Sequence, residues 1–186
     1  MTDHEAVPAL GSVVEQDRGS LPFALVHGEA LVACASWALG EAGVTAVDLG
    51  TEWAGIVDSG EPFVLHDALC PMTPASFVQA CVARAVETGR VVVGARPVTD
   101  TVKTVTEGRV GETLDREALR VVASPIVLPA EVVAALPGLP TTDFAALVEW
   151  LRGAHEVELA EAPPSARRVA SEDDVRLLEA LTAPEG

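Results

Sequence analysis

Short apolar runs alternate with helix-like segments along this chain, and that alternation limits the fold more than any other feature. Residues 29–42 carry apolar side chains at helical spacing and end at Gly43, a suitable helix C-cap. Residues 44–49 then have the pattern of a buried strand, and residues 10–14 that of an earlier one. The chain therefore opens as a β-α-β unit. Such a unit is the start of a doubly wound α/β sheet.

The same pattern continues toward the C-terminus. Residues 63–67 form an apolar strand, Thr73 and Pro74 are predicted to begin a helix as N-cap and first-turn proline, and Gly89 ends that helix. Further strands and helices are predicted at residues 91–93, 119–123, 129–136, 143–152 and 155–160. With 186 residues, 49% of them hydrophobic, the chain fits a single domain spanning residues 1–186.

Residues 97–118 stand apart as a predicted protruding β arm. An extended Thr/Val-rich segment runs to Gly108, which turns the chain back antiparallel. This segment holds Lys103, the only lysine of the sequence, close to Asp100 and Thr101, and the returning segment leads to Arg116. If both cations share one side of the arm, they form an anion site. The alternative is an ordinary hairpin with exposed charges.

Charge and composition exclude several classes of partner. A net charge of -16 repels phosphate backbones, so we expect neither nucleic acid nor a membrane surface as a partner. Against this acidic background, seven of the twelve basic residues fall within residues 84–120. Three widely spaced cysteines indicate neither a disulfide framework nor a zinc site. The first residues lack a basic segment followed by an apolar one, and no apolar run is membrane-spanning in length, so we expect a cytoplasmic protein.

Two linked motifs carry a family resemblance. Residues 97–103 (PVTDTVK) and 113–116 (TLDR) resemble the arm of the 2-C-methyl-D-erythritol 4-phosphate cytidylyltransferases of the non-mevalonate isoprenoid pathway. The resemblance implies a nucleotidyltransferase-type α/β fold with three layers and a doubly wound, mostly parallel sheet. It also implies that the arm crosses to a second subunit, and hence a homodimer. It also implies that the arm helps to bind the sugar phosphate, with Asp100, Thr101, Lys103 and Arg116 as substrate-binding residues.

Two further segments extend the resemblance. Residues 63–71 (FVLHDALCP) resemble the family's His-Asp-Ala-Ala-Arg-Pro segment, which implies that Asp67 is catalytic and lies near metal-bound phosphates, with Mg²⁺ as the metal. The alternative is a satisfied His66–Asp67 loop pair. Arg168 stands where the family has a lysine that reaches the active site, and Arg18 stands where it has a loop arginine. Both are candidate catalytic residues, although Arg18 is open to interpretation as a surface charge.

The sequence also departs from the family in the segments that bind the nucleotide. The glycine-rich phosphate loop is absent, with Glu15 and Asp17 in its place and Phe23 where the family has lysine. Cys70 replaces the arginine of the His-Asp segment, and no second histidine is placed to activate it as a nucleophile. Residues 50–62 are too few for the strand and helix that carry a second nucleotide motif, and residues 19–83 contain no Arg or Lys. The sequence therefore argues against CTP binding.

These observations predict a degenerate family member, a homodimeric binding or regulatory protein for a sugar phosphate or another small phosphorylated ligand. The alternative is an active cytidylyltransferase that transfers CMP from CTP to 2-C-methyl-D-erythritol 4-phosphate. Arg18 and Arg168 would then be phosphate ligands, with Mg²⁺ near Asp67. An unrelated activity on the same sheet also remains open. A cytidylyltransferase requires five residues to converge on one pocket: Arg18, Asp67, Lys103, Arg116 and Arg168. A scaffold requires only that the arm is paired.

Overall fold

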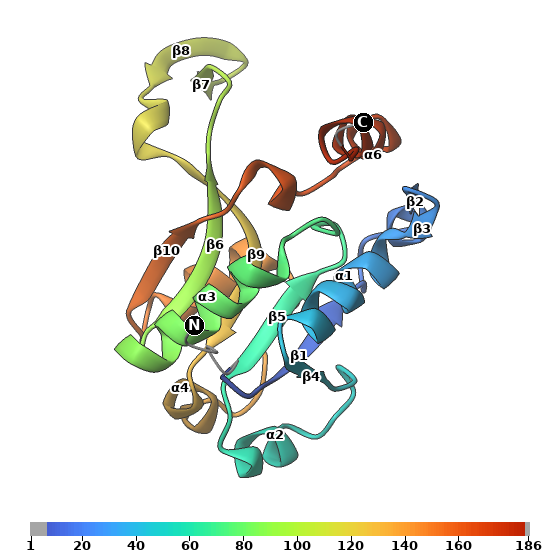
Figure 1. The fold of residues 1–186 in the computed structure, drawn as a ribbon. Helices are drawn as coiled ribbons and strands as arrows, with labels where there is room; N and C mark the ends of the chain where they lie inside the picture. The colour runs from blue at the N-terminus through green and yellow to red at the C-terminus, as the bar shows by residue number, and fades with distance from the viewer. Residues whose placement is uncertain (1–6, 185–186) are drawn as a thin grey trace, which may run out of the picture.

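The protein folds around one six-stranded sheet (Figure 1). The structure is a computed structural model that describes residues 7–184. Only β9 runs antiparallel to its neighbours β5 and β6, so the sheet is mostly parallel, as predicted. In spatial order the strands are β10 (Val157–Glu161), β6 (Val91–Pro97), β9 (Arg120–Leu128), β5 (Phe63–Asp67), β1 (Ala9–Val14) and β4 (Val44–Ala46).

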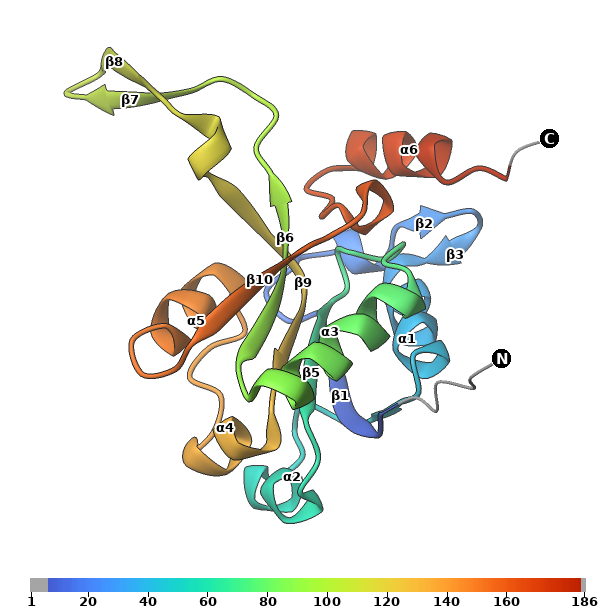
Figure 2. The ribbon, with the colours of Figure 1, turned by 60° about the vertical axis from the view of Figure 1, so that its left-hand side comes forward.

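Helices cover both faces of the sheet and produce the predicted three layers (Figure 2). On one face, α1 (Leu31–Glu41) and α3 (Ala75–Thr88) pack against alternate residues of the central strands, such as Val64 and Val92. On the other face, α2 (Trp53–Ser59), α4 (Ala130–Ala135) and α5 (Phe144–Leu151) enclose Phe63 and Leu65. Because β5 is apolar on both faces, it lies buried at the centre and fixes the position of the residues at its end.

Some local predictions were wrong. The strand predicted as buried at residues 44–49 is the three-residue β4, where only Val44 is buried, because β4 lies at the sheet edge and pairs with β1 alone. The cap of α3 is Pro74, while the Thr73 hydroxyl donates to the Cys70 carbonyl oxygen (2.8 Å). Gly89 does end α3, in the left-handed conformation.

The predicted arm protrudes from the sheet beyond β6 and β9 (Figures 1 and 2). It consists of the antiparallel strands β7 (Val102–Thr106) and β8 (Arg109–Leu114). Arg116 lies beyond β8, on the 3-10 turn Arg116–Ala118, and not on the hairpin itself. Val105 and Val110, at 66% and 71% exposure, leave the arm with uncovered apolar side chains.

A small satellite core holds the C-terminal segment in place. The helix α6 (Glu172–Leu181) packs through Val175 and Leu178 against the hairpin formed by β2 (Leu25–Val26) and β3 (Glu29–Ala30). The Val169 N–H donates to the Leu69 carbonyl oxygen (2.8 Å), which ties this segment to the loop after β5. Among residues 7–184, no helix combines the length and the apolar character needed to cross a membrane.

Candidate functional site

Asp67 is a buried carboxylate at the carboxyl end of β5, where open α/β sheets bind ligands. Its side chain is 1% exposed. The Leu69 N–H donates to Asp67 Oδ1 (3.0 Å), and the Asp67 N–H donates to the Ser124 hydroxyl oxygen (3.0 Å). Strand geometry and these two bonds therefore hold both the backbone and the carboxylate of Asp67.

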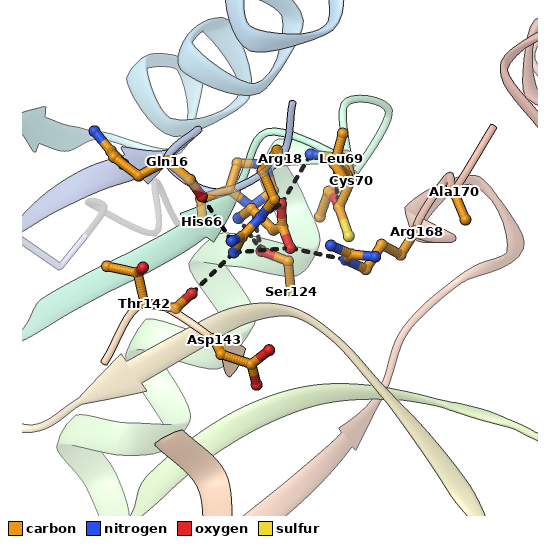
Figure 3. A network of polar contacts seen from close by, with 12 residues as sticks. Gln16, Arg18, His66, Leu69, Cys70, Ser124, Thr142, Asp143, Arg168 and Ala170 are labelled. Atoms are coloured by element: carbon orange, nitrogen blue, oxygen red, sulfur yellow. Dashed lines mark hydrogen bonds and ion pairs between the residues drawn. The ribbon is translucent and has the colours of Figure 1, made fainter. Parts of the chain in front are cut away.

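Two arginines from opposite ends of the sequence meet at this carboxylate (Figure 3). Arg18, in the loop after β1, donates from Nε to Asp67 Oδ1 (3.2 Å), and Arg168 donates from Nε to Oδ2 (2.9 Å). The three predicted catalytic residues thus lie together. The interpretations of Arg18 as a surface charge and of His66–Asp67 as a loop pair are wrong, because Asp67 pairs with the two arginines and the Arg18 side chain is 6% exposed.

The two guanidinium groups differ in how many donors remain free. Arg18 also donates to the carbonyl oxygens of Gln16 (2.8 Å) and Thr142 (2.9 Å) and lies over the Phe144 ring. Arg168 uses only Nε in hydrogen bonds with the described residues, and its side chain is 38% exposed. Arg168 can therefore offer both of its terminal amino groups to a ligand, whereas Arg18 mainly holds the site together.

A cavity of about 370 Å³ opens beside this cluster. Its charged lining residues are three arginines and two aspartates, which leaves one net positive charge in a strongly acidic chain. Sequence reasoning missed Arg120 and treated Asp143 only as a cap; the Asp143 side chain does cap α5 by accepting from the Ala146 N–H (2.8 Å). The charged residues lining the cavity are Arg18, Asp67, Arg120, Asp143 and Arg168.

Ser124, on β9, supports the site from the neighbouring strand. Because its oxygen accepts from the Asp67 N–H, its own hydrogen is free to be donated to His66 Nδ1. His66 is fully buried, and burial lowers its pKa to about 4, against a weaker opposing effect of Asp67. The imidazole is therefore neutral at pH 7, and its Nε2 has no hydrogen-bond partner among the described residues.

Cys70 lies next to the same cluster, but its thiol is unreactive. Burial raises the pKa of its thiol, and the negative charge of Asp67 raises it further, so the reactive thiolate is not populated at neutral pH. A nucleophilic role therefore has no support.

The predicted substrate-binding residues of the arm lie outside this cavity. Lys103 Nζ donates to the Thr113 hydroxyl oxygen (2.8 Å), and Arg116 donates to the Thr99 carbonyl oxygen (2.9 Å). Asp100 and Thr101 lie in the exposed segment between β6 and β7. Arg116 lines a neighbouring open cavity of about 710 Å³, and Arg120 lines both cavities. Of the five residues that an enzyme would bring together, Arg18, Asp67 and Arg168 lie in one cluster. Lys103 and Arg116 do not line the cavity beside it.

A third cavity, of about 400 Å³, adjoins the surroundings of Arg18 through Gln16 and Thr142. Trp53 and Phe63 form part of its wall, and Asp48 is its only charged lining residue. A lining with one carboxylate and no cation suits an uncharged group better than a phosphate.

The cluster does not fit a divalent metal ion. Both oxygens of Asp67 accept from guanidinium groups. Among residues 7–184, no three or more His, Cys, Asp or Glu side chains gather in an arrangement able to hold a metal. Mg²⁺ requires several oxygen ligands, and the neighbouring cations repel it.

Comparison with known proteins gives one consistent family. A sequence model described as 2-C-methyl-D-erythritol 4-phosphate cytidylyltransferase matches residues 40–183. Curated proteins of that name match from Saccharopolyspora erythraea, with 37% identity over 133 residues (69% of this chain and 58% of that protein), and from Nocardia farcinica, with 38% over 122 residues (64% and 52%). The chain spans between half and three fifths of the length of these curated relatives.

Solved structures give the same fold. The crystal structure of 2-C-methyl-D-erythritol 4-phosphate cytidylyltransferase from Thermus thermophilus superposes with a TM-score of 0.66 at 22% identity. That match covers 92% of this chain and 96% of the other. A 4-diphosphocytidyl-2C-methyl-D-erythritol synthase superposes with a TM-score of 0.68 at 15% identity, covering 95% and 99%. Both show that the nucleotidyltransferase-type architecture is shared.

Proposed function

The chain belongs to the 2-C-methyl-D-erythritol 4-phosphate cytidylyltransferase family, and from this premise we propose that it binds a small phosphorylated ligand but has lost CTP binding. In this proposal, residues 1–186 act as one domain of a homodimeric binding or regulatory protein. The observation that carries it is the cluster of Arg18, Asp67 and Arg168 beside a cavity with net positive charge.

A sugar phosphate suits this cluster. The free amino groups of Arg168 form the planar fork that binds a phosphate through two hydrogen bonds. Arg120 connects this cavity with the one lined by Arg116 at the base of the arm, so a ligand longer than phosphate alone spans both. Charge-assisted bonds of this kind contribute roughly 1.5–3 kcal/mol each.

The region where the family binds its nucleotide lacks the cations that a triphosphate requires. Transfer of a nucleotidyl group requires cations around the phosphates, and removal of a single arginine from such a site commonly costs about 10³ to 10⁵ in rate. No Arg or Lys occurs in residues 19–83, and the cavity of about 400 Å³ has an aspartate as its only charged lining residue. These features support a protein that has lost the reaction.

An active cytidylyltransferase is the second candidate. The convergence of Arg18, Asp67 and Arg168 favours it, as does the cavity that adjoins Arg18 and is large enough for a nucleobase. In this candidate Arg18 and Arg168 are the phosphate ligands.

The arm, residues 97–118, is proposed to contact a second subunit. Val105 and Val110 present uncovered apolar side chains on a hairpin that extends away from the sheet, which is unfavourable for an isolated monomer. In this arrangement Lys103 and Arg116 of one subunit approach the cavity of the other and complete the anion site.

Calorimetric titration tests the proposal. We expect heat of binding with 2-C-methyl-D-erythritol 4-phosphate and none with CTP plus Mg²⁺. CTP binding would overturn the loss of the nucleotide site and make a turnover assay the next step. No heat with either compound would reject the phosphorylated-ligand function and leave a dimeric scaffold.

Single substitutions then locate the ligand. Arg168→Gln and Lys103→Ala should each weaken sugar-phosphate binding by about tenfold or more without unfolding the protein, because each removes one exposed charge-assisted donor. Arg152→Gln is the matched control, since Arg152 is exposed and pairs with Glu149 on its own helix. Unchanged affinity in Lys103→Ala would exclude the arm from the site.

A further inference from the structure

Asp67 has no free coordination position. Its Oδ1 accepts from the Leu69 N–H (3.0 Å) and from Arg18 Nε (3.2 Å), and its Oδ2 accepts from Arg168 Nε (2.9 Å) and Arg18 Nη2 (3.5 Å). A carboxylate has about four acceptor positions, so these four donors saturate it. A metal ion would first have to displace one of the guanidinium groups.

Displacing Arg18 is unfavourable for reasons outside the carboxylate. Its side chain is almost entirely buried, and the carbonyl oxygens of Gln16 and Thr142 also accept from it. Without Asp67 its charge would remain buried and uncompensated. A divalent ion at Asp67 would also lie against the positive charge of Arg168.

The site already carries the positive charge that a metal ion would provide. Two guanidinium groups against one carboxylate leave one fixed positive charge, and the terminal amino groups of Arg168 carry part of it toward the cavity. We infer that Asp67 is a counter-ion that positions two arginines, and that the site binds its phosphorylated ligand without a divalent cation. This inference rests on the proposed function for its ligand; the claim about Asp67 stands on the geometry alone.

The first experiment tests the carboxylate without any ligand. Mn²⁺ is added to the isotope-labelled wild-type protein, and paramagnetic broadening of the amide signals is recorded. We expect the Leu69 amide, bonded to Asp67 Oδ1, to keep its intensity while amides near the exposed carboxylates of Glu172 and Asp173 broaden first. Selective broadening of Leu69 at substoichiometric Mn²⁺ would overturn the inference.

The second experiment tests the ligand. Titration with 2-C-methyl-D-erythritol 4-phosphate in EDTA and in MgCl₂ should give dissociation constants within about twofold of each other, since a saturated carboxylate leaves no metal position. Arg168→Gln should weaken binding by the same factor in both buffers. Affinity at least about tenfold higher with Mg²⁺, a difference of about 1.4 kcal/mol, would overturn metal independence. No binding in either buffer would reject the proposed function and the ligand part of the inference, while the manganese result would still decide the role of Asp67.

Discussion

His66 is the residue whose burial has the clearest consequence for stability. Its folded-state pKa is lowered from 6.5 to about 4, so between these values the unfolded chain binds more protons than the folded one. The free energy of unfolding therefore falls as the pH drops through this window. From the two pKa values, the loss between pH 7 and pH 5 is about 2 kcal/mol. Urea denaturation at both pH values measures it.

The control separates His66 from the acidic side chains that also titrate. His66→Gln should reduce the loss of unfolding free energy between pH 7 and pH 5 by about 2 kcal/mol. An equal loss in both proteins would contradict the prediction. If the variant does not fold, the imidazole signals of wild-type His66 serve instead, and they should not titrate between pH 7 and pH 5, because burial holds the pKa lower.

At the scale of elements, β6 and β9 approach unusually closely beneath the arm. A Cβ on Gly94 would collide with the carbonyl carbon and oxygen of Ser124, at the register shift between Val93 and Ala95. Ser124 in turn contacts His66 and the Asp67 N–H. The spacing of these two strands therefore also sets the position of the candidate site.

We expect Gly94→Ala to lower the free energy of unfolding by roughly 1–3 kcal/mol, since it overpacks a backbone contact. It should also weaken binding of the sugar phosphate through Ser124 and Asp67. Chemical denaturation and calorimetry measure the two effects. Gly40→Ala in α1, where an added Cβ meets nothing within 4 Å, is the control and should be neutral or slightly stabilising. A Gly94→Ala protein as stable as wild type would show that the strands can separate at no cost.

The elements that the sequence predicted well share one property. β5 is an apolar run that is buried on both faces, and α3 has a stripe of apolar residues at helical spacing that ends at Gly89. Neighbouring residues alone therefore identify both elements. The pairing within the site is different. Arg18 lies 49 residues before Asp67 and Arg168 lies 101 residues after it, and no local pattern predicts that contact. Family resemblance named all three residues but not their mutual pairing.

For the whole molecule, the exposed arm predicts self-association. Sedimentation equilibrium should give a dimer for the wild type, and the double substitution Val105→Glu, Val110→Glu should give a folded monomer, because within one chain both side chains lie in solvent. Leu177→Glu on α6, another exposed apolar position, is the control and should remain dimeric. A wild type that is monomeric at all concentrations would reject the arm as an interface.

The two ion pairs that join Arg18, Asp67 and Arg168 also have a consequence for folding during synthesis. During synthesis, Asp67 leaves the ribosome about a hundred residues before Arg168. Until then the carboxylate has one of its two counter-charges, and the donor most exposed to ligand is missing. The sheet can begin to form from the earlier segments, but the proposed anion site is incomplete until the segment that carries Arg168 has been synthesised. A nascent chain that lacks this segment is therefore expected to be partly folded and unable to bind the proposed ligand.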